Sequence, residues 1–436
     1  MKLRAALLAL TLLAGAAEAG PVLMISLDGL RPADVIEAEK KGLKLPNLTA
    51  FLKQSAYASG VRNVLPTVTY PDHTTLITGV WPDKHGVGNN EMLDPTGKNL
   101  QGWYWYAEDI KVPTLWDAVH ASGGKVGSVG WPVSVGSLAI DENVPEYWRA
   151  QNAEDLKLLR AVATPGLIGK LEKETRLPLG ALFGEDPQHD VARATYAIEI
   201  MADLKPQFMT VHLVSLDHYQ HTYGPDSAES KKALEALDAD VGKLIAAAKA
   251  AHPDVTIAVV SDHGFAAVHD GVYLDRIFAE AGLITIENGK VTDWQAYAWN
   301  AGGSAAIVLK DPNDAAVKAK VEALLAKLAA DPKSGVARVI DAKAVAERGG
   351  SPKASYWVDF KIGYSGEGDF TISKTYTLKG THGYFPDHKE MRATFMIAGP
   401  GIKAAKLGEI DMRDIAPTLA KVLDVKLDKA DGKPLL

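Results

Sequence analysis

The chain is organised around the stretch at residues 65–74, which reads Leu65-Pro66-Thr67-Val68-Thr69-Tyr70-Pro71-Asp72-His73-Thr74. A hydroxyl residue, Thr69, stands two places before a proline, and an apolar helical pattern continues to about Thr78, where Gly79 follows. Proline suits the first turn of a helix, because its missing N–H has no partner there anyway. We therefore expect Thr69 at a helix N-terminus, which favours an anion. Its hydroxyl is either an ordinary N-cap or a nucleophile held beside a phosphate.

Composition limits the classes of protein to consider. The 436 residues are 47% apolar and 23% charged, enough for one large α/β domain or two ordinary ones. The net charge of −7 argues against a protein that binds nucleic-acid polymers through a basic surface. No cysteine occurs. Disulfides and thiolate metal sites are therefore excluded, and any metal must be held by His, Asp and Glu.

Residues 1–19 have the pattern of a signal peptide. Lys2 and Arg4 form a basic start, an apolar run follows, and Ala17-Glu18-Ala19 matches an A-x-A cleavage site. The alternative is an uncleaved membrane anchor, for which the apolar run is short. We expect a mature chain that begins at Gly20 and is exported to the periplasm or secreted. No later stretch is apolar and long enough to span a membrane.

Apolar runs expected to be buried strands alternate with helical patterns along the mature chain. The strands are expected at 22–27, 125–130, 208–214 and 255–260, and the helices at 46–57, 113–122, 153–171, 191–204 and 227–251. This alternation predicts a doubly wound α/β sheet with helices on both faces. Between about 271 and 375 the pattern loosens, with helices expected at 314–330 and 341–348, and we interpret this part as an inserted cap. A strand at 393–398 and a helix at 413–423 close a single catalytic domain, residues 20–436.

Acidic residues and histidines gather where these strands end. Three strands end in Asp28, Asp217 and Asp262, at the sheet edge where open α/β sheets bind ligands. The histidines come from the same places and from one glycine-flanked loop: His221 four residues after Asp217, His263 next to Asp262, and His382 between Thr381 and Gly383. Three Asp and three His suffice for two zinc ions with three protein ligands each. The other nine histidines, including His73, His85, His212 and His218, are interpreted as structural or solvated.

Several motifs occur in one order along almost the whole mature chain. They are Ser26-Leu27-Asp28-Gly29, residues 66–73, Thr78-Gly79, His85-Gly86, Asn90, Asp217-His218-Tyr219-Gln220-His221, Gly224-Pro225, Asp262-His263-Gly264 and His382-Gly383-Tyr384. This set resembles the nucleotide pyrophosphatase/phosphodiesterase family of the alkaline phosphatase superfamily. Two positions depart from the family pattern: Asp72 stands where Asn is usual, and Gln220 where Gly often precedes the ligand histidine.

The resemblance implies a fold and a site. It implies an alkaline-phosphatase-like fold and a nucleophile at Thr69, although composition alone would also allow Thr67. Asn90 looks like the family's asparagine that bonds a phosphate oxygen. The implied ligands of one zinc ion are Asp217, His221 and His382, and those of the second are Asp28, Asp262 and His263, with Thr69 touching the second ion.

The expected function is zinc-dependent hydrolysis of phosphodiester or pyrophosphate bonds through a phospho-threonine intermediate, with nucleotide-type small molecules as favoured substrates. Residues 132–147 contain no Lys or Arg, which favours a diester over a more highly charged monoester. Tyr70, Trp131 and Tyr147 are candidate substrate contacts, as is Trp148, although core packing is an equally good interpretation of each.

Three other functions compete with this one. A phosphomonoesterase or a phosphonate hydrolase would use the same nucleophile and ligands. A sulfatase is excluded, because Thr69 cannot be converted to formylglycine. A non-catalytic zinc-binding module would not need the hydroxyl.

Overall fold

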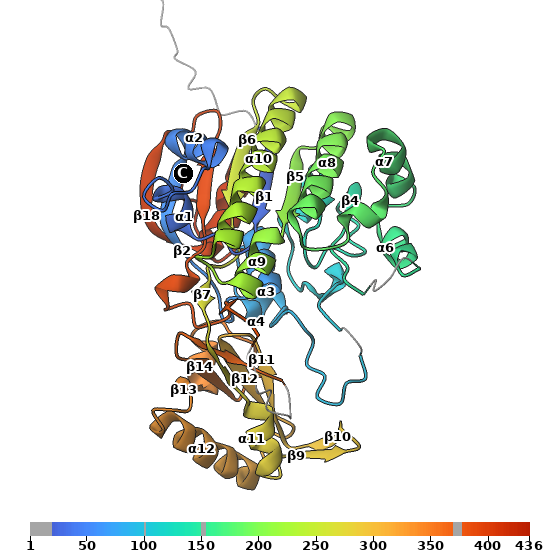
Figure 1. Ribbon diagram of the computed structural model, residues 1–436. Coiled ribbons are helices and arrows are strands. Elements are labelled where there is room, and N and C mark those ends of the chain that lie inside the picture. The colour runs from blue at the N-terminus through green and yellow to red at the C-terminus, as the bar shows by residue number, and fades with distance from the viewer. Residues whose placement is uncertain (1–19, 100–101, 150–153, 369–376) are drawn as a thin grey trace, which may run out of the picture.

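Eight strands form the central sheet of the computed structural model, which describes residues 20–99, 102–149, 154–368 and 377–436 (Figure 1). Their order is β18-β2-β17-β6-β1-β5-β3-β4, and β17 alone among them runs antiparallel to its neighbours. The strands are β1 (Val22–Leu27), β2 (Ala56–Arg62), β3 (Val126–Val129), β4 (Glu142–Val144), β5 (Phe208–Leu213), β6 (Thr256–Val260), β17 (Phe395–Ala398) and β18 (Ala405–Asp411).

Alternating side chains of the buried strands reach two separate cores. In β1, Leu23 and Ile25 pack with helices α2 (Pro46–Gln54), α8 (Pro187–Leu204) and α10 (Ala228–Ala251). Val22 and Met24 point to the other face and pack with α3 (Thr69–Thr78), α5 (Leu115–Ala121) and α14 (Ile415–Val422). The sheet therefore carries helices on both faces, which confirms the predicted doubly wound α/β class.

The remaining helices near this sheet are short. They are α1 (Pro32–Ile36), α4 (Pro82–His85), α6 (Leu156–Val162), α7 (Leu167–Thr175), α9 (Ser215–Tyr223) and the 3-10 turns Ala107–Asp109, Leu179–Leu182, Lys389–Met391 and Met412–Asp414.

Two predicted helices were too long. The helix expected at 46–57 ends at Gln54, because Ser55 is already extended and the following residues form β2. The helix expected at 153–171 is two helices, α6 and α7, separated by Pro165 and by Gly166 with φ of +82°. Both glycine at positive φ and proline interrupt helices, so these breaks have a local cause.

A second, four-stranded sheet lies below the central sheet in the view of Figure 1, in the order β11-β12-β14-β13. With neighbouring helices and a separate two-stranded hairpin, this sheet forms one group of elements, most of which enclose a third core. They are α11 (Leu274–Glu280), β9 (Ile284–Glu287), β10 (Lys290–Trp294), β11 (Ala296–Asn300), β12 (Ser304–Leu309), α12 (Ala315–Ala330), β13 (Val336–Asp341), α13 (Ala342–Ala346) and β14 (Tyr356–Phe360). Two short strand pairs flank it, β7 (Ala266–Ala267) with β16 (Gly380–Thr381) and β8 (Asp270–Val272) with β15 (Tyr364–Gly366). The second sheet falls within the stretch expected to be an inserted cap, and that division of the chain stays a prediction.

One buried carboxyl in the second sheet's core gives a testable pH dependence. Asp275 accepts a hydrogen bond from the backbone N–H of Ala298 at 3.2 Å, and its Oδ2 has no hydrogen-bond partner among the described residues. Burial raises the pKa of Asp275 to about 7, against which that hydrogen bond acts weakly. The folded protein thus holds this proton more tightly than the unfolded chain does.

We expect the free energy of unfolding to fall as the pH rises from about 4 to about 7, by up to about 4 kcal/mol from this group. Asp275→Asn should remove this contribution to the pH dependence of the unfolding free energy, because the amide cannot ionise. Urea unfolding at several pH values measures it, with the exposed Asp270→Asn as the control that keeps the slope. An unchanged slope in Asp275→Asn would contradict the assignment.

In the described part of the chain, no helix has both the length and the apolar character that crossing a bilayer requires. The predicted signal peptide, residues 1–19, lies outside the described residues.

Candidate functional site

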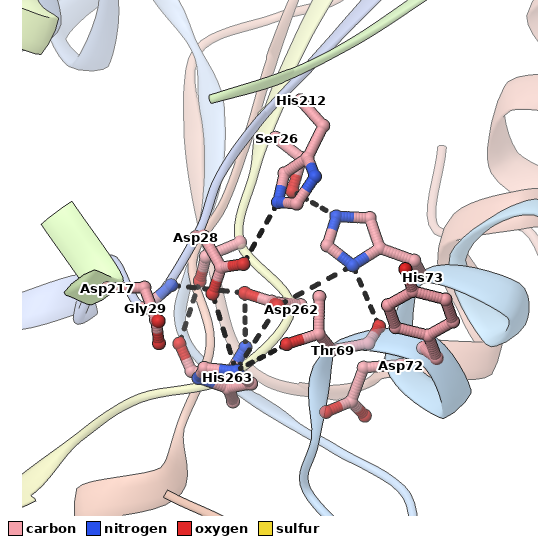
Figure 2. Close-up of polar contacts among 12 residues, drawn as sticks. Ser26, Asp28, Gly29, Thr69, Asp72, His73, His212, Asp217, Asp262 and His263 are labelled. Atoms are coloured by element: carbon pink, nitrogen blue, oxygen red, sulfur yellow. Dashed lines mark hydrogen bonds and ion pairs between the residues drawn. The ribbon is translucent and has the colours of Figure 1, made fainter. Parts of the chain in front are cut away.

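The predicted ligands meet at the carboxyl ends of three adjacent parallel strands. Asp28 directly follows β1, Asp262 and His263 follow β6, and Asp217 lies in the first turn of α9, after β5. Figure 2 shows Asp28, Asp217, Asp262 and His263 converging on one space beside Thr69. Parallel neighbours end at the same edge of a sheet, so the strand order itself gathers these side chains.

One group of candidate ligands consists of Asp217, His221 and His382. Each of these residues has one ligand atom, a histidine nitrogen or a carboxylate oxygen, and the three atoms lie within 4.8 Å of one another. The Nε2 atom of His221 lies 3.5 Å from Oδ2 of Asp217, and the Nε2 atom of His382 lies 3.7 Å from Oδ1 of the same carboxylate. The structure therefore brings together the first predicted ligand set.

The residues of the second predicted set, Asp28, Asp262 and His263, also lie together, although the group of mutually close ligand atoms that includes His263 combines it with Asp28 and Asp217. The Nε2 atom of His263 lies 3.4 Å from Oδ1 of Asp28 and 3.3 Å from Oδ2 of Asp262. The imidazole rings of His263 and His382 stack with their centroids 3.6 Å apart, so the two sets are neighbours.

The hydrogen bonds around these six residues fit a pair of cations. Each histidine ring has its Nδ1 against a backbone carbonyl: that of Gly380 for His221, Gly264 for His263 and Thr67 for His382, at 2.9 to 3.1 Å. An Nδ1–H donated to a carbonyl leaves Nε2 as the coordinating atom. Each carboxylate has a buried oxygen with no hydrogen-bond partner among the described residues, namely Oδ1 of Asp28, Oδ1 of Asp217 and Oδ2 of Asp262. Buried oxygens of this kind need a partner, and a metal ion would supply it.

The electrostatics of the site point the same way. Burial, reinforced by the charge of Asp262, raises the pKa of Asp28 and of Asp217 well above the usual range. Burial also lowers the pKa of His221 to about 4 and that of His382 to about 3. The rings are therefore neutral at pH 7 and can act as ligands, and a bound metal cation would offset the cost of charging the buried carboxylates.

Thr69 is the first residue of α3, one place after the N-cap Val68. Its hydroxyl does not cap the helix. Oγ1 instead lies 3.5 Å from Nε2 of His263 and borders the cavity described below. The plain N-cap interpretation of Thr69 is therefore wrong, and the hydroxyl faces the candidate ligands.

Asn90 lies beside the start of the same helix. Its Oδ1 accepts a hydrogen bond from the backbone N–H of Tyr70 at 2.9 Å, which fixes the orientation of the side-chain amide. Because the oxygen is used, the amide NH₂ group is available to donate into the cavity that Asn90 lines.

A cavity of about 280 Å³ opens over the first ligand set and over Asp28 of the second set. Among the described residues, its lining contains neither Lys nor Arg, and it consists of Asp28, Thr69, Asn90, Trp103, Glu146, Trp148, Glu185, His212, Val214, Asp217, His218, His221 and His382. Trp103 was not predicted, because nothing marks a tryptophan in an irregular loop as facing a site. Trp148 had been considered as a substrate contact, and it lines the cavity.

Two predicted substrate contacts are wrong. Tyr70 and Trp131 are fully buried and line no part of the cavity. Trp131 packs edge-on against His73 and Trp116, as a core residue does. Tyr147 is 8% exposed and lines a smaller neighbouring cavity beside Trp148, so its contact with substrate stays a prediction.

His212 was interpreted as structural, yet it contacts a candidate ligand directly. Its Nε2 lies 3.0 Å from Oδ2 of Asp28 (Figure 2). Its Nδ1 lies 3.1 Å from Oε2 of Glu146. Burial lowers the pKa of His212, but the hydrogen bond and the charge of Glu146 outweigh burial and raise it overall. One sequence signal could have indicated this role: His212 lies near the end of a largely apolar strand, shortly before the helix that carries candidate ligands.

Comparison with known proteins identifies the family of this chain. A model of the family "Type I phosphodiesterase / nucleotide pyrophosphatase" matches residues 22–385. The chain is 28% identical, over 284 residues, to ectonucleotide pyrophosphatase/phosphodiesterase family member 1 of Homo sapiens, covering 63% of this chain and 26% of that protein. It thus spans about a quarter of that relative's length. An uncharacterized pyrophosphatase/phosphodiesterase of Schizosaccharomyces pombe is 26% identical over 430 residues, covering 94% of this chain and 78% of that one.

Among solved structures, murine ectonucleotide pyrophosphatase/phosphodiesterase 5, determined as an inactive variant in complex with AMP, superposes with a TM-score of 0.68. The alignment covers 95% of this chain and 97% of that one at 20% identity. This likeness confirms the predicted alkaline-phosphatase-like fold. Since the family model spans most of the chain, the resemblance found in the sequence is confirmed, and the chain belongs to the type I phosphodiesterase / nucleotide pyrophosphatase family.

Proposed function

We propose that this chain is a metal-dependent hydrolase of phosphodiester or pyrophosphate bonds in nucleotide-type small molecules, with Thr69 as the nucleophile. One observation carries the proposal: the Thr69 hydroxyl lies at a helix N-terminus, 3.5 Å from His263, and borders the same cavity as the first ligand set and Asp28. Membership of the family supports the same activity.

Asp217, His221 and His382 would hold one ion, and Asp28, Asp262 and His263 the other. We propose zinc for both, because three His and three Asp with no cysteine suit it, and manganese or iron would suit this set less well. When bound, such ions lower the pKa of a hydroxyl or of a water molecule and neutralise charge on phosphate oxygens.

The residues of the chain perform the remaining steps. After its hydroxyl proton is lost to solvent, Oγ1 of Thr69 forms a bond to phosphorus while the bond from phosphorus to the leaving oxygen breaks. Water then cleaves the phospho-threonine and restores the hydroxyl. The amide of Asn90, held by the N–H of Tyr70, donates to a phosphate oxygen. The dipole of α3 favours negative charge at the same place.

The cavity lining supports a substrate of low charge. A monoester dianion carries one more negative charge than a diester, and the lining offers no Lys or Arg to meet it. Glu146 and Glu185 add negative charge instead. Trp103 and Trp148 provide flat apolar surface on which a base could stack.

We expect a nitrophenyl ester of a nucleotide, a diester, to exceed nitrophenyl phosphate in kcat/KM by well over tenfold, which corresponds to more than about 1.4 kcal/mol of transition-state binding. Steady-state kinetics with both substrates at saturating zinc measure this, and a choline diester serves as the non-nucleotide comparison. A preference for the monoester would assign the chain to the phosphomonoesterases.

The pattern of residues 1–19 supports export of the chain to the periplasm or the medium, where small phosphate esters would be its substrates.

A further inference from the structure

A chain of buried hydrogen bonds joins the Asp28 carboxylate to the helix that carries Thr69. The phenol of Tyr70, the residue after Thr69, donates to Oε1 of Glu146 at 2.7 Å. The other oxygen of Glu146 lies 3.1 Å from Nδ1 of His212, whose Nε2 lies 3.0 Å from Oδ2 of Asp28. All four side chains are at most 6% exposed. Bonds buried to this extent are screened little by water and hold their geometry.

This network of hydrogen bonds binds one carboxylate oxygen of Asp28 and leaves the other without a hydrogen-bond partner among the described residues. Oδ2 is bound by His212, whereas Oδ1 has no hydrogen-bond partner among the described residues and lies 3.4 Å from Nε2 of His263. Asp262 shows the same division by different means. Its Oδ1 accepts hydrogen bonds from the backbone N–H groups of Gly29 and His263, at 3.1 and 2.9 Å. Its Oδ2 has no hydrogen-bond partner among the described residues.

We infer that His212, backed by Glu146 and Tyr70, is a positioning residue that fixes the Asp28 carboxylate so that Oδ1 is presented to the metal. For Asp262 the backbone performs this task, but for Asp28 it falls to a side chain. Glu146 is consequently not a free base in the cavity, because both of its oxygens are already bonded. The inference rests on the metal site of the proposed function and adds residues that neither the ligand set nor the nucleophile includes.

The two nitrogens of His212 can be tested separately. The amide nitrogen of glutamine lies close to the position of the histidine Nε2, so His212→Gln keeps a donor toward Asp28. The amide nitrogen of asparagine lies close to Nδ1, so His212→Asn keeps the bond to Glu146 and loses the one to Asp28. The readout is metal retention during dialysis against graded chelator, which needs no substrate.

We expect His212→Asn to weaken retention of the more loosely held metal by about 10- to 100-fold and His212→Gln by no more than about threefold. Equal retention in the two variants, whether normal or reduced, would overturn the inference, as would a larger loss in His212→Gln. A wild-type chain that binds no metal would overturn the proposed function as well, so the two failures are distinguishable.

Tyr70→Phe provides a milder variant that removes only the hydroxyl at the far end of the network. Its matched control is Tyr196→Phe, since the Tyr196 phenol is also bonded inside the protein, to the Leu177 carbonyl at 2.9 Å, and lies on α8, which supplies none of the six predicted ligands. We expect Tyr70→Phe to weaken metal retention about two- to fivefold and Tyr196→Phe to leave it unchanged. Equal effects would remove Tyr70 from the positioning network.

Discussion

Thr69→Ala is expected to lower kcat/KM for a nucleotide diester by at least about 10³-fold, or about 4 kcal/mol, while the protein stays folded and keeps its metal. The loss follows from removing the only atom that forms the covalent intermediate. The fold should tolerate the change, because Val68 is the N-cap of α3 and the Thr69 hydroxyl caps nothing. Kinetics, elemental analysis and thermal unfolding of the same preparation measure the three quantities together.

Thr69→Ser is the matched control, because it keeps a hydroxyl at the same position. It should retain far more activity than the alanine variant, and a phosphorylated residue should be trapped on it or on the wild type at low pH. Wild-type turnover by Thr69→Ala would refute nucleophilic catalysis by this residue. Loss of metal from Thr69→Ala would instead favour a structural role for the hydroxyl.

Removal of metal is expected to abolish activity and to destabilise the fold. Without cations, three carboxylates remain buried together with one unbonded oxygen each. A metal present at about 1,000 times its dissociation constant stabilises the folded state by about 4 kcal/mol per site. For two sites in a chain of this size, chelation should lower Tm by roughly 5–10 °C.

Calorimetry before and after verified metal removal tests this result, and elemental analysis of active protein should give two zinc ions per chain. Zn²⁺ added back should restore both Tm and turnover, whereas Mg²⁺, which prefers oxygen ligands, should restore neither. Asp217→Ala lacks one ligand and should show a smaller chelator effect. An unchanged Tm after complete metal removal would contradict a structural contribution from the ions.

The gathering of five of the six candidate ligands, all except His382, could be predicted because it depends on topology. Parallel strands end at one edge, so an acidic residue after each strand reaches a common place whatever the details of packing. His382 could not be placed by that argument, since it follows the second sheet's elements and is brought back by the pairing of β16 with β7. Its glycine neighbours and the family resemblance indicated it instead.

Side-chain direction was harder to predict. Tyr70 adjoins the nucleophile in sequence, but successive helix residues are rotated by about 100°, which turns its ring into the core. His212 lies between Val211 and Leu213 in a largely apolar strand, and only the register that sets it beside Ser26 of β1 reveals its closeness to Asp28. The register of strand pairing and the face that a helix turns toward the core depend on tertiary structure, so these side-chain directions could not be predicted from a single sequence.

The fold was predicted best where periodicity was strong. Strands β1, β5 and β6 occur where expected, since buried parallel strands are continuous apolar runs. Strand β2 was merged into the helix before it, because Ala56 and Tyr57 prolong that helix's apolar pattern. The strands of the second sheet were not predicted, although β12 and β14 are fully buried and at least as long as β6.

His382 lies far along the sequence, and this affects the order in which the two candidate ligand sets are completed during synthesis. The set formed by Asp28, Asp262 and His263 is complete once residue 263 has been synthesised, but the other set needs a histidine 119 residues further on. The carbonyl of His382 is held by the N–H of Gly303 at 2.6 Å, and its ring by the carbonyl of Thr67. If the two sets bind metal as proposed, a nascent chain shorter than 382 residues would load at most one ion, and the second ion would enter only after the second sheet has docked.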